Sequence, residues 1–277
     1  MTFIITFISL IIERFFHWNH LRYWRWFDVY QRAISRRIAN WPSYLLLVIC
    51  ILPLMIVAGL IDVILSHWFY GVPRLIFGVL ILLYCMGPEN LWAQAYACLG
   101  ELQKDDPKAV VDRAQTAFGI TLPENSQAFH QALTRAIFIE ANTRIFAVIF
   151  WFIILGPAGA IMYRSIAMCA KQSDLGLTQA ASVVRKILDW VPARILTFIF
   201  ALGGHFTEVF QVWKKDIRLG LNGNDQLLGE CGIAALDAKK SNQVAENGSA
   251  EKEALSLLDR VFIMVLVLLA MIVIMTR

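Results

Sequence analysis

Residues 43–66 form an apolar run in which Asp62 is the only charged side chain. A transmembrane helix needs about 20 mostly apolar residues to cross about 30 Å of hydrocarbon, and this run is longer than that. Pro53 lies inside the run, where a membrane helix tolerates it as a kink. A second apolar run over 72–87 follows after a short turn. We therefore predict a helical membrane hairpin over 43–87.

The composition supports lipid as the solvent for much of the chain. Hydrophobic residues make up 58% of the 277 residues and charged residues 17%, whereas soluble domains contain about 45–50% and about 25%. No segment shows the alternation of a strand. The predicted fold class is all-α: a polytopic helical integral membrane protein with helical cytoplasmic segments. The five cysteines are far apart and include no C-x-x-C pair, so we expect neither a disulfide framework nor a metal site.

Two further runs are long enough to be membrane helices, namely 145–162 and the shorter tail Val261–Met275. Residues 2–12 are too short to span unless their helix continues through the next two residues. Residues 187–204 contain a proline and two charged side chains. This last segment could cross the membrane, re-enter it or lie in the interface.

Six arginines lie between Arg14 and Arg37 among several aromatic residues. Such a strip could bind nucleic acid, but beside a membrane span it is typical of a cytoplasmic segment that contacts anionic lipid. We expect no nucleic-acid partner. The hairpin returns the chain to the cytoplasm for 88–139, where amphipathic helices are predicted over PENLWAQAYACLGELQKDD and over DDPKAVVDRAQTAFG, with Gly119 as a stop. A third helix, which begins near PENSQAFHQALTRAIFIE, is expected to run continuously into the membrane.

These patterns predict five regions along the chain. They are an N-terminal membrane region over 1–87 (basic segment 14–41, hairpin 43–87), a cytoplasmic helical region over 88–139, a membrane region over 140–213, a cytoplasmic segment with a flexible linker over 214–258, and a C-terminal membrane helix over 259–277.

Glu140, Asn142 and Arg144 stand at the start of the run over 145–162. An ionisable group at membrane depth costs at least about 2.5 kcal/mol, so it is paired, interfacial or functional. One interpretation is a boundary ion pair, because Glu140 and Arg144 have i,i+4 spacing on a helix. That pair leaves Asn142 unexplained. The other interpretation is a polar ligand site at the cytoplasmic mouth of the bundle, and we expect at least two of the three side chains to face the interior.

Other polar residues are candidates for the same site. Arg194 follows Pro192, which we expect at a kink or a helix start, and it should turn inward toward Glu140 or Asp189. Glu13 precedes an arginine after the first apolar run, and is a second possible neighbour of the polar triplet. His205 follows two glycines, a context that is more typical of an interfacial histidine than of a catalyst.

Several of these motifs resemble the AmpE family of bacterial inner-membrane proteins. The resemblance rests on EANTRIFAVIFWFIILGPAGAIMYR, KILDWVPARILTFIFAL, LIIERFF and ALGGHF, and it covers essentially the whole chain. More distantly, the chain is similar to the CobD/CbiB membrane family of cobalamin biosynthesis. Members of that family form an amide bond with ATP and Mg²⁺, and they carry an E-N-x-x-D pattern where this chain has E-A-N-T-R. Arg144 thus stands about where a metal-binding carboxylate would be wanted.

The resemblance implies an inner-membrane regulatory or sensory protein linked to β-lactamase induction and cell-wall recycling. In this role it would bind an anionic lipid or a cell-wall fragment in a polar pocket at the cytoplasmic face. The alternative is an amide-forming enzyme, and only that alternative calls for ATP and Mg²⁺ as cofactors. A transporter is disfavoured, because no inverted repeat is detectable. The sequence leaves the oligomeric state open.

Overall fold

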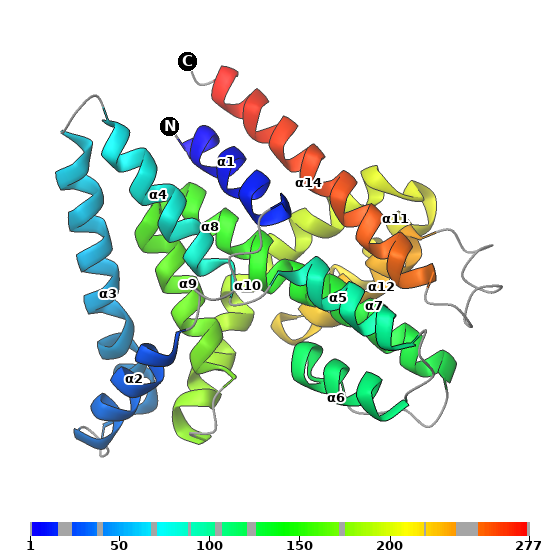
Figure 1. Cartoon of the computed structure of the whole chain (residues 1–277), viewed down its shortest axis with the longest axis horizontal. Helices are drawn as coiled ribbons and strands as arrows, with labels where there is room; N and C mark the ends of the chain where they lie inside the picture. Colours follow the sequence, from blue (N-terminus) through cyan, green and yellow to red (C-terminus); the bar gives the residue numbers. More distant parts are fainter. Residues whose placement is uncertain are drawn as a thin grey trace. The chain divides into compact units, whose positions relative to one another are not determined.

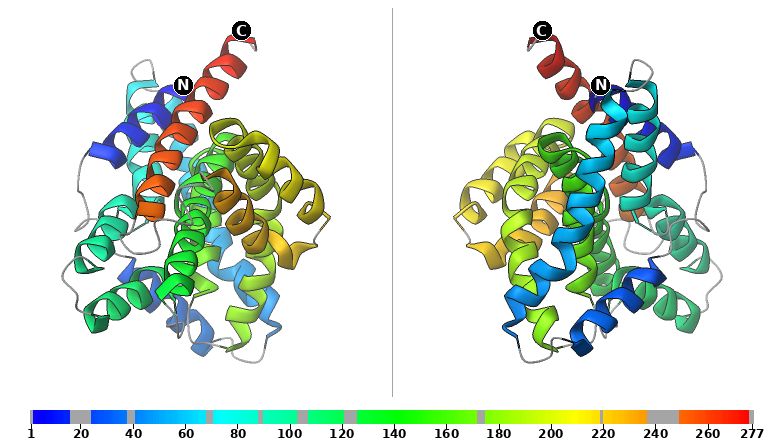
Figure 2. Two further views of the ribbon diagram at one scale, coloured as in Figure 1. Left: turned by 90° about the vertical axis from the view of Figure 1, so that its right-hand side faces the viewer. Right: turned by 90° about the vertical axis from the view of Figure 1, so that its left-hand side faces the viewer.

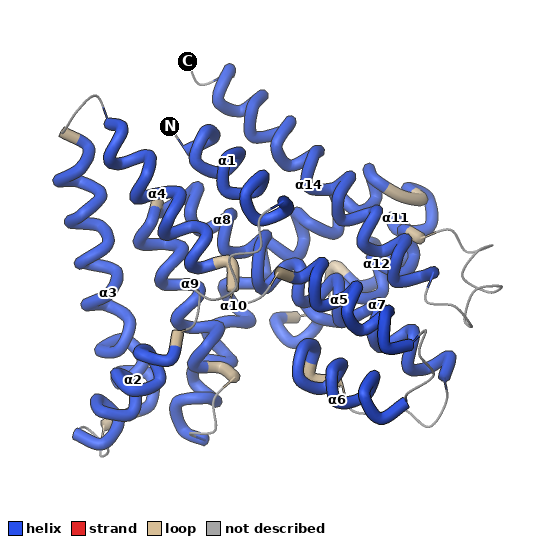
Figure 3. The backbone as a smooth tube through the Cα atoms, in the orientation of Figure 1, coloured by secondary structure: helices blue, strands red, loops and turns tan. Residues whose placement is uncertain are grey.

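In the computed structural model, the described residues form helices and contain no strand (Figure 3). The structure describes residues 2–15, 24–37, 41–67, 71–87, 90–102, 107–120, 126–171, 175–218, 220–236 and 249–275. The predicted all-α fold is confirmed for these ranges. Three helices in them are long and apolar enough to cross a membrane: Ser43–Ser66, Ala128–Leu155 and Ser249–Met275. At 1.5 Å per residue, each is roughly 36–42 Å long, which exceeds the hydrocarbon thickness.

The chain folds into two compact units, each made of two separate segments. The first unit comprises Met1–Asn90 and Thr143–Asp189, and the second comprises Leu91–Asn142 and Trp190–Arg277. The chain passes between the units three times: once at Asn90–Leu91, directly before a helix begins, and twice inside helical stretches, at Asn142–Thr143 and at Asp189–Trp190 (Figure 1).

The first unit contains α1 (Thr2–Phe15), α2 (Arg25–Arg37), α3 (Ser43–Ser66), α4 (Val72–Cys85), α8 (Ala147–Leu155), α9 (Pro157–Cys169) and the first half of α10 (Leu175–Gly203). Helix α9 packs against α3, α4 and α8, and α1 packs against α4 (Figure 2). The outer face of α3 is exposed and apolar, with Val48, Leu52 and Ile56 each about half exposed. Such a surface is suited to lipid rather than to water.

The predicted hairpin is present as α3 and α4, and an ion pair joins the two helices. Arg74 donates two hydrogen bonds of 2.9 Å to the two carboxylate oxygens of Asp62. The bidentate pair satisfies both groups together, and the Asp62 side chain is only 15% exposed.

The span expected over 145–162 is divided in the structure. The apolar helix ends at Leu155, because Gly156 adopts φ 66° and ψ −152° and Pro157 then starts α9. Gly156 permits a backbone conformation that other residues rarely adopt, and Pro157 is favoured in a first helical turn. The helix that is long enough to span begins before this run and extends from Ala128 to Leu155.

The second unit contains α5 (Leu91–Leu102), α6 (Pro107–Phe118), α7 (Ser126–Ala141), the second half of α10, α11 (Phe206–Asp216), the short 3₁₀ turn η4 (Leu221–Gly223), α12 (Asn224–Ala235) and α14 (Ser249–Met275). Helix α7 packs against α5, α6, α12 and α14. The two predicted cytoplasmic helices are present as α5 and α6, and Gly119 ends α6 with φ 67°. Residues 237–248, within the predicted flexible linker, lie outside the described residues.

The last helix begins at Ser249, earlier than the boundary at 259 that the apolar pattern indicated. Its first turns are polar, but Glu251, Leu255 and Leu258 are fully buried, and α14 packs against α7. Ala, Glu, Lys and Leu in these turns are strong helix formers, and the buried contacts with α7 stabilise the helix further.

All five cysteines are buried and free. They pack as small apolar side chains.

Candidate functional site

A π-helical turn over Asn142–Phe146 (η3) interrupts the helix at the polar triplet. π-Helical turns are rare in proteins, and those that occur are often found at functional sites. Glu140, Asn142 and Arg144 are 8%, 1% and 8% exposed. All three side chains are thus buried, and the predicted i,i+4 pair lies across a π-helical turn rather than on a regular α-helix. Their proximity to Arg194 or to Glu13 stays a prediction.

A buried polar network joins three helical segments of the first unit. The Tyr163 hydroxyl of α9 donates a 2.6 Å hydrogen bond to Oδ1 of Asp189 on α10. Nε of Arg185 lies 3.6 Å from Oδ2 of the same carboxylate, and Thr143 of the π-helical turn hydrogen-bonds Tyr163. We call Thr143, Tyr163, Arg185 and Asp189 the Tyr163 cluster.

The Tyr163 cluster contains a carboxylate that is almost wholly removed from solvent. Asp189 is 3% exposed and Tyr163 is fully buried. A 2.6 Å contact is typical of a hydroxyl that donates to an ionised carboxylate. Arg185 supplies the opposite charge along the same helix at i,i+4 spacing.

Two guanidinium groups of the first unit are buried, those of Arg144 and Arg164. Gly87, with φ 115°, packs against Arg164: a Cβ atom at this glycine would lie 3.5 Å from Nη2 of the guanidinium. The buried carboxylates of this unit are those of Glu13 and Asp189 among the described residues. The backbone carbonyl of Glu13 also accepts a hydrogen bond from the Asn90 side chain.

Arg194 lies in the second unit and is 9% exposed. It donates to the backbone carbonyls of Trp190 (2.9 Å) and Ile217 (3.3 Å) and to Oδ1 of Asn224 (3.0 Å). Its guanidinium also lies 4.1 Å from the centre of the Trp190 ring. These contacts are with neutral oxygens and an aromatic face, and the predicted carboxylate partner of Arg194 stays a prediction.

Pro192 lies inside α10 rather than at a helix start. A proline cannot donate to the carbonyl four residues earlier, which here belongs to Leu188. The indole N–H of Trp151 donates to that carbonyl at 3.3 Å. Helix α8 therefore satisfies the acceptor that the proline leaves open, and this explains how a proline is accommodated within α10.

His205 is exposed at the start of α11, between α10 and that helix. Its backbone N–H donates to the carbonyl of Ala235. At the preceding Gly204, a Cβ atom would lie 2.4 Å from that same carbonyl oxygen. The glycines of the ALGGHF motif thus include one that permits a close approach of the end of α12.

Sequence reasoning missed Thr143, Tyr163, Arg164 and Arg185 as candidates. One signal was available: Arg185 and Asp189 have i,i+4 spacing on a helix. We had instead paired Asp189 with Arg194. The contact between Tyr163 and Asp189 joins residues that are far apart in the sequence, and no local pattern predicts it.

Within the ranges that the structure describes, no group of three or more His, Cys, Asp or Glu side chains is placed to hold a metal ion.

Comparisons with known proteins identify the family. The family model described as "Regulatory signalling modulator protein AmpE" matches residues 1–277. Protein AmpE of Shigella flexneri is 26% identical over 230 residues, which cover 77% of this chain and 78% of that protein.

Two cobalamin biosynthesis proteins named CobD are also similar. Each is 26% identical: that of Chromobacterium violaceum over 38% of this chain and that of Stutzerimonas stutzeri over 57%. The matches span only 36% and 54% of the lengths of those proteins. No solved structure matches the chain. The three membrane-length helices agree with the inner-membrane, multi-pass location of the family. By its full-length match, the chain belongs to the AmpE family of regulatory membrane proteins.

Proposed function

We propose that this chain is a sensory protein that contributes to β-lactamase induction and cell-wall recycling by binding an anionic ligand at the buried arginines of its first unit. The observation that carries this proposal is the burial of Arg144 and Arg164, 8% and 9% exposed, in the unit that also contains Arg185. A purely structural role would not require them, because buried charges can often be replaced by apolar side chains without loss of stability.

The chemistry of guanidinium groups defines the ligand class. Arginine binds carboxylates and phosphates through paired N–H donors, and both groups occur on cell-wall fragments and on lipid headgroups. Thr143 of the Tyr163 cluster lies between Asn142 and Arg144 in the π-helical turn, so the predicted triplet and the cluster are adjacent in the chain.

Binding would act on the contact between α9 and α10. Arg185 is 3.6 Å from Asp189, whereas Tyr163 is 2.6 Å from it. An incoming anion would compete with Asp189 for Arg185 and leave Tyr163 as the main partner of the carboxylate. The resulting shift of α10 against α9 is the proposed signal.

The test compares Arg185→Gln with Arg135→Gln in a strain whose own copy of the gene is replaced, with β-lactamase induction as the readout. Arg135 pairs with Glu230 at 2.7 Å, but the Arg135 side chain is 45% exposed, so it is a matched surface control. We expect Arg185→Gln, and likewise Glu140→Gln, Asn142→Ala and Arg144→Lys, to abolish the response at an unchanged membrane protein level. The Arg135→Gln strain should respond normally. A normal response from Arg185→Gln would contradict the proposal.

The similarity to the two CobD proteins favours one second candidate, an amide-forming enzyme that acts on a cell-wall or lipid intermediate. Its test is ATP turnover by the purified chain in the presence of Mg²⁺ and membrane extract. Turnover that Arg144→Lys leaves intact but Glu140→Gln abolishes would favour this enzyme over the sensor.

A further inference from the structure

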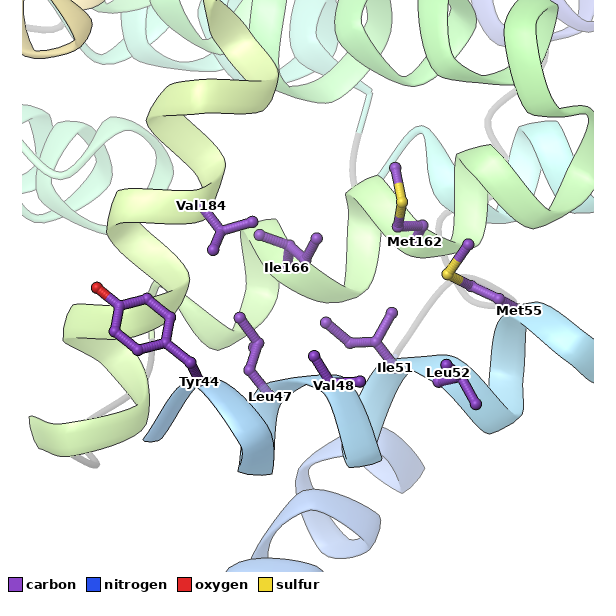
Figure 4. A pocket seen from close by; sticks show the side chains of 9 residues that line it. All are labelled: Tyr44, Leu47, Val48, Ile51, Leu52, Met55, Met162, Ile166 and Val184. Carbon is purple, nitrogen blue, oxygen red and sulfur yellow. The ribbon is translucent and has the colours of Figure 1, made fainter. Parts of the chain in front are cut away.

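A groove lined by apolar side chains runs along the first half of α3 (Figure 4). Six of its lining residues lie on α3, from Tyr44 at one end to Met55 at the other. Met162 and Ile166 of α9 and Val184 of α10 line the opposite side. All of these residues belong to the first unit, and the cavity volume is about 240 Å³.

The groove has a closed floor and an open rim. Leu47 and Ile51 are 3% and 5% exposed and point toward Ile166 and Val184, whereas Val48 and Leu52 are 50% and 49% exposed at its edge. Eleven residues of helix separate Tyr44 from Met55, a rise of roughly 16 Å. One leaflet of a bilayer has about 15 Å of hydrocarbon. The groove is therefore about as long as one leaflet is thick.

Positive charge lies at the Tyr44 end of the groove. Helix α2 precedes α3 and packs against it, and it contains four arginines against the single acidic residue Asp28. Arg36 and Arg37 end α2 with exposed side chains. Tyr44 is 55% exposed, as expected for an aromatic ring at the headgroup level.

We propose that this groove is a lipid site, which holds one acyl chain of an anionic phospholipid with its headgroup at Arg36 and Arg37. Between apolar surfaces in a bilayer, association depends on close packing rather than on the hydrophobic effect, so a groove of matching length selects a chain by shape. The arginines select the headgroup by charge. The occupant is a bilayer phospholipid, and this inference does not rest on the proposed ligand of the Tyr163 cluster.

The acyl-chain part is tested by native mass spectrometry of the full-length protein, delipidated in detergent and titrated with phosphatidylglycerol. Val48→Trp fills the groove from its rim. Val57→Trp makes the same change on α3 outside the groove, at a residue that is 54% exposed. We expect Val48→Trp to weaken lipid binding at least about fivefold, because an added ring must displace the chain. Val57→Trp should bind as the unmodified protein does.

The headgroup part compares phosphatidylglycerol with phosphatidylcholine of the same acyl chains. One basic residue near an anionic surface contributes about fivefold in affinity. The double variant Arg36→Gln/Arg37→Gln should therefore reduce the preference for phosphatidylglycerol by about 5- to 30-fold. The control Lys214→Gln/Lys215→Gln removes the same charge from exposed positions on α11 and should leave the preference unchanged.

Three results would overturn the proposal. Undiminished lipid binding by Val48→Trp would exclude the groove as the site, and equal loss in both double variants would make the charge effect nonspecific. A dimer that Val48→Trp abolishes while lipid binding persists would show that a second copy of the chain covers the groove instead.

Discussion

Replacing Tyr163 by phenylalanine removes one hydroxyl and leaves the ring in place. Asp189 then loses its 2.6 Å donor while it remains 3% exposed, so water cannot take over that hydrogen bond. A hydrogen bond to a charged group contributes about 1.5–3 kcal/mol. Because the site is dry, we expect a loss near the upper end, about 2–3 kcal/mol. For a protein of this size such a loss lowers Tm by about 4–12 °C.

The assay is thermal unfolding of the full-length protein in detergent, followed by intrinsic fluorescence. Tyr96→Phe is the matched control, because Tyr96 is 48% exposed on α5, and it should leave Tm unchanged. Combining Tyr163→Phe with Asp189→Asn should cost less than the sum of the two single changes, because both remove the same interaction. If Tyr163→Phe lowers Tm no more than Tyr96→Phe, the buried hydrogen bond does not contribute as argued.

Three further predictions concern other parts of the molecule. Gly159→Ala would place a Cβ atom 2.2 Å from the carbonyl oxygen of Trp151, whereas a Cβ at Gly59 meets nothing within 4 Å. We therefore expect Gly159→Ala to lower the free energy of unfolding by about 1–3 kcal/mol or more, and Gly59→Ala to be neutral or stabilising. Equal melting temperatures of the two variants would contradict this prediction. His130→Ala should destabilise the protein by about 3–5 kcal/mol, because it leaves the fully buried Glu251, now 2.7 Å from His130, without this partner. The double replacement His130→Leu/Glu251→Leu should recover much of the loss, and a Tm for His130→Ala equal to that of the unmodified protein would refute the pairing. Burial raises the pKa of Cys98 to about 11, so about one thiol in a thousand is ionised at pH 8 and alkylation by iodoacetamide should be slow. The alkylation rate should rise about tenfold per pH unit up to that pKa. The prediction is wrong if peptide mass spectrometry finds that Cys98 is alkylated as fast in the folded chain as in the urea-unfolded chain.

Local apolar patterns were enough to predict α3 and α5. The run over 43–66 became α3 with both boundaries as predicted, and the amphipathic helix predicted over PENLWAQAYACLGELQKDD became α5, in which Leu91, Ala95 and Cys98 are buried. Both features depend on residues close in the chain, namely on the length of apolar sequence that lipid requires and on the helical repeat.

Hydropathy alone placed one membrane helix incorrectly. The run over 145–162 is uniformly apolar, but Gly156 and Pro157 end α8 inside it. The helix extends in the other direction, through the polar Glu140, Asn142 and Arg144, as predicted for the helix that starts in PENSQAFHQALTRAIFIE and runs into the membrane. These side chains can be accommodated there because protein buries them, and hydropathy carries no information about what covers a residue.

What the sequence by itself determined is therefore the helical membrane architecture, the family and the presence of costly polar groups in apolar surroundings. Only the tertiary structure decided which of these groups meet. Asp189 contacts Tyr163 and Arg185, and Arg194 contacts Asn224 and two backbone carbonyls. A buried charge needs a hydrogen-bonding partner, but the sequence does not show which of the many polar atoms in the chain will lie close to it. The packing of α9 against its neighbours and the π-helical turn at Asn142 bring particular side chains within hydrogen-bonding distance, and those are properties of the folded chain.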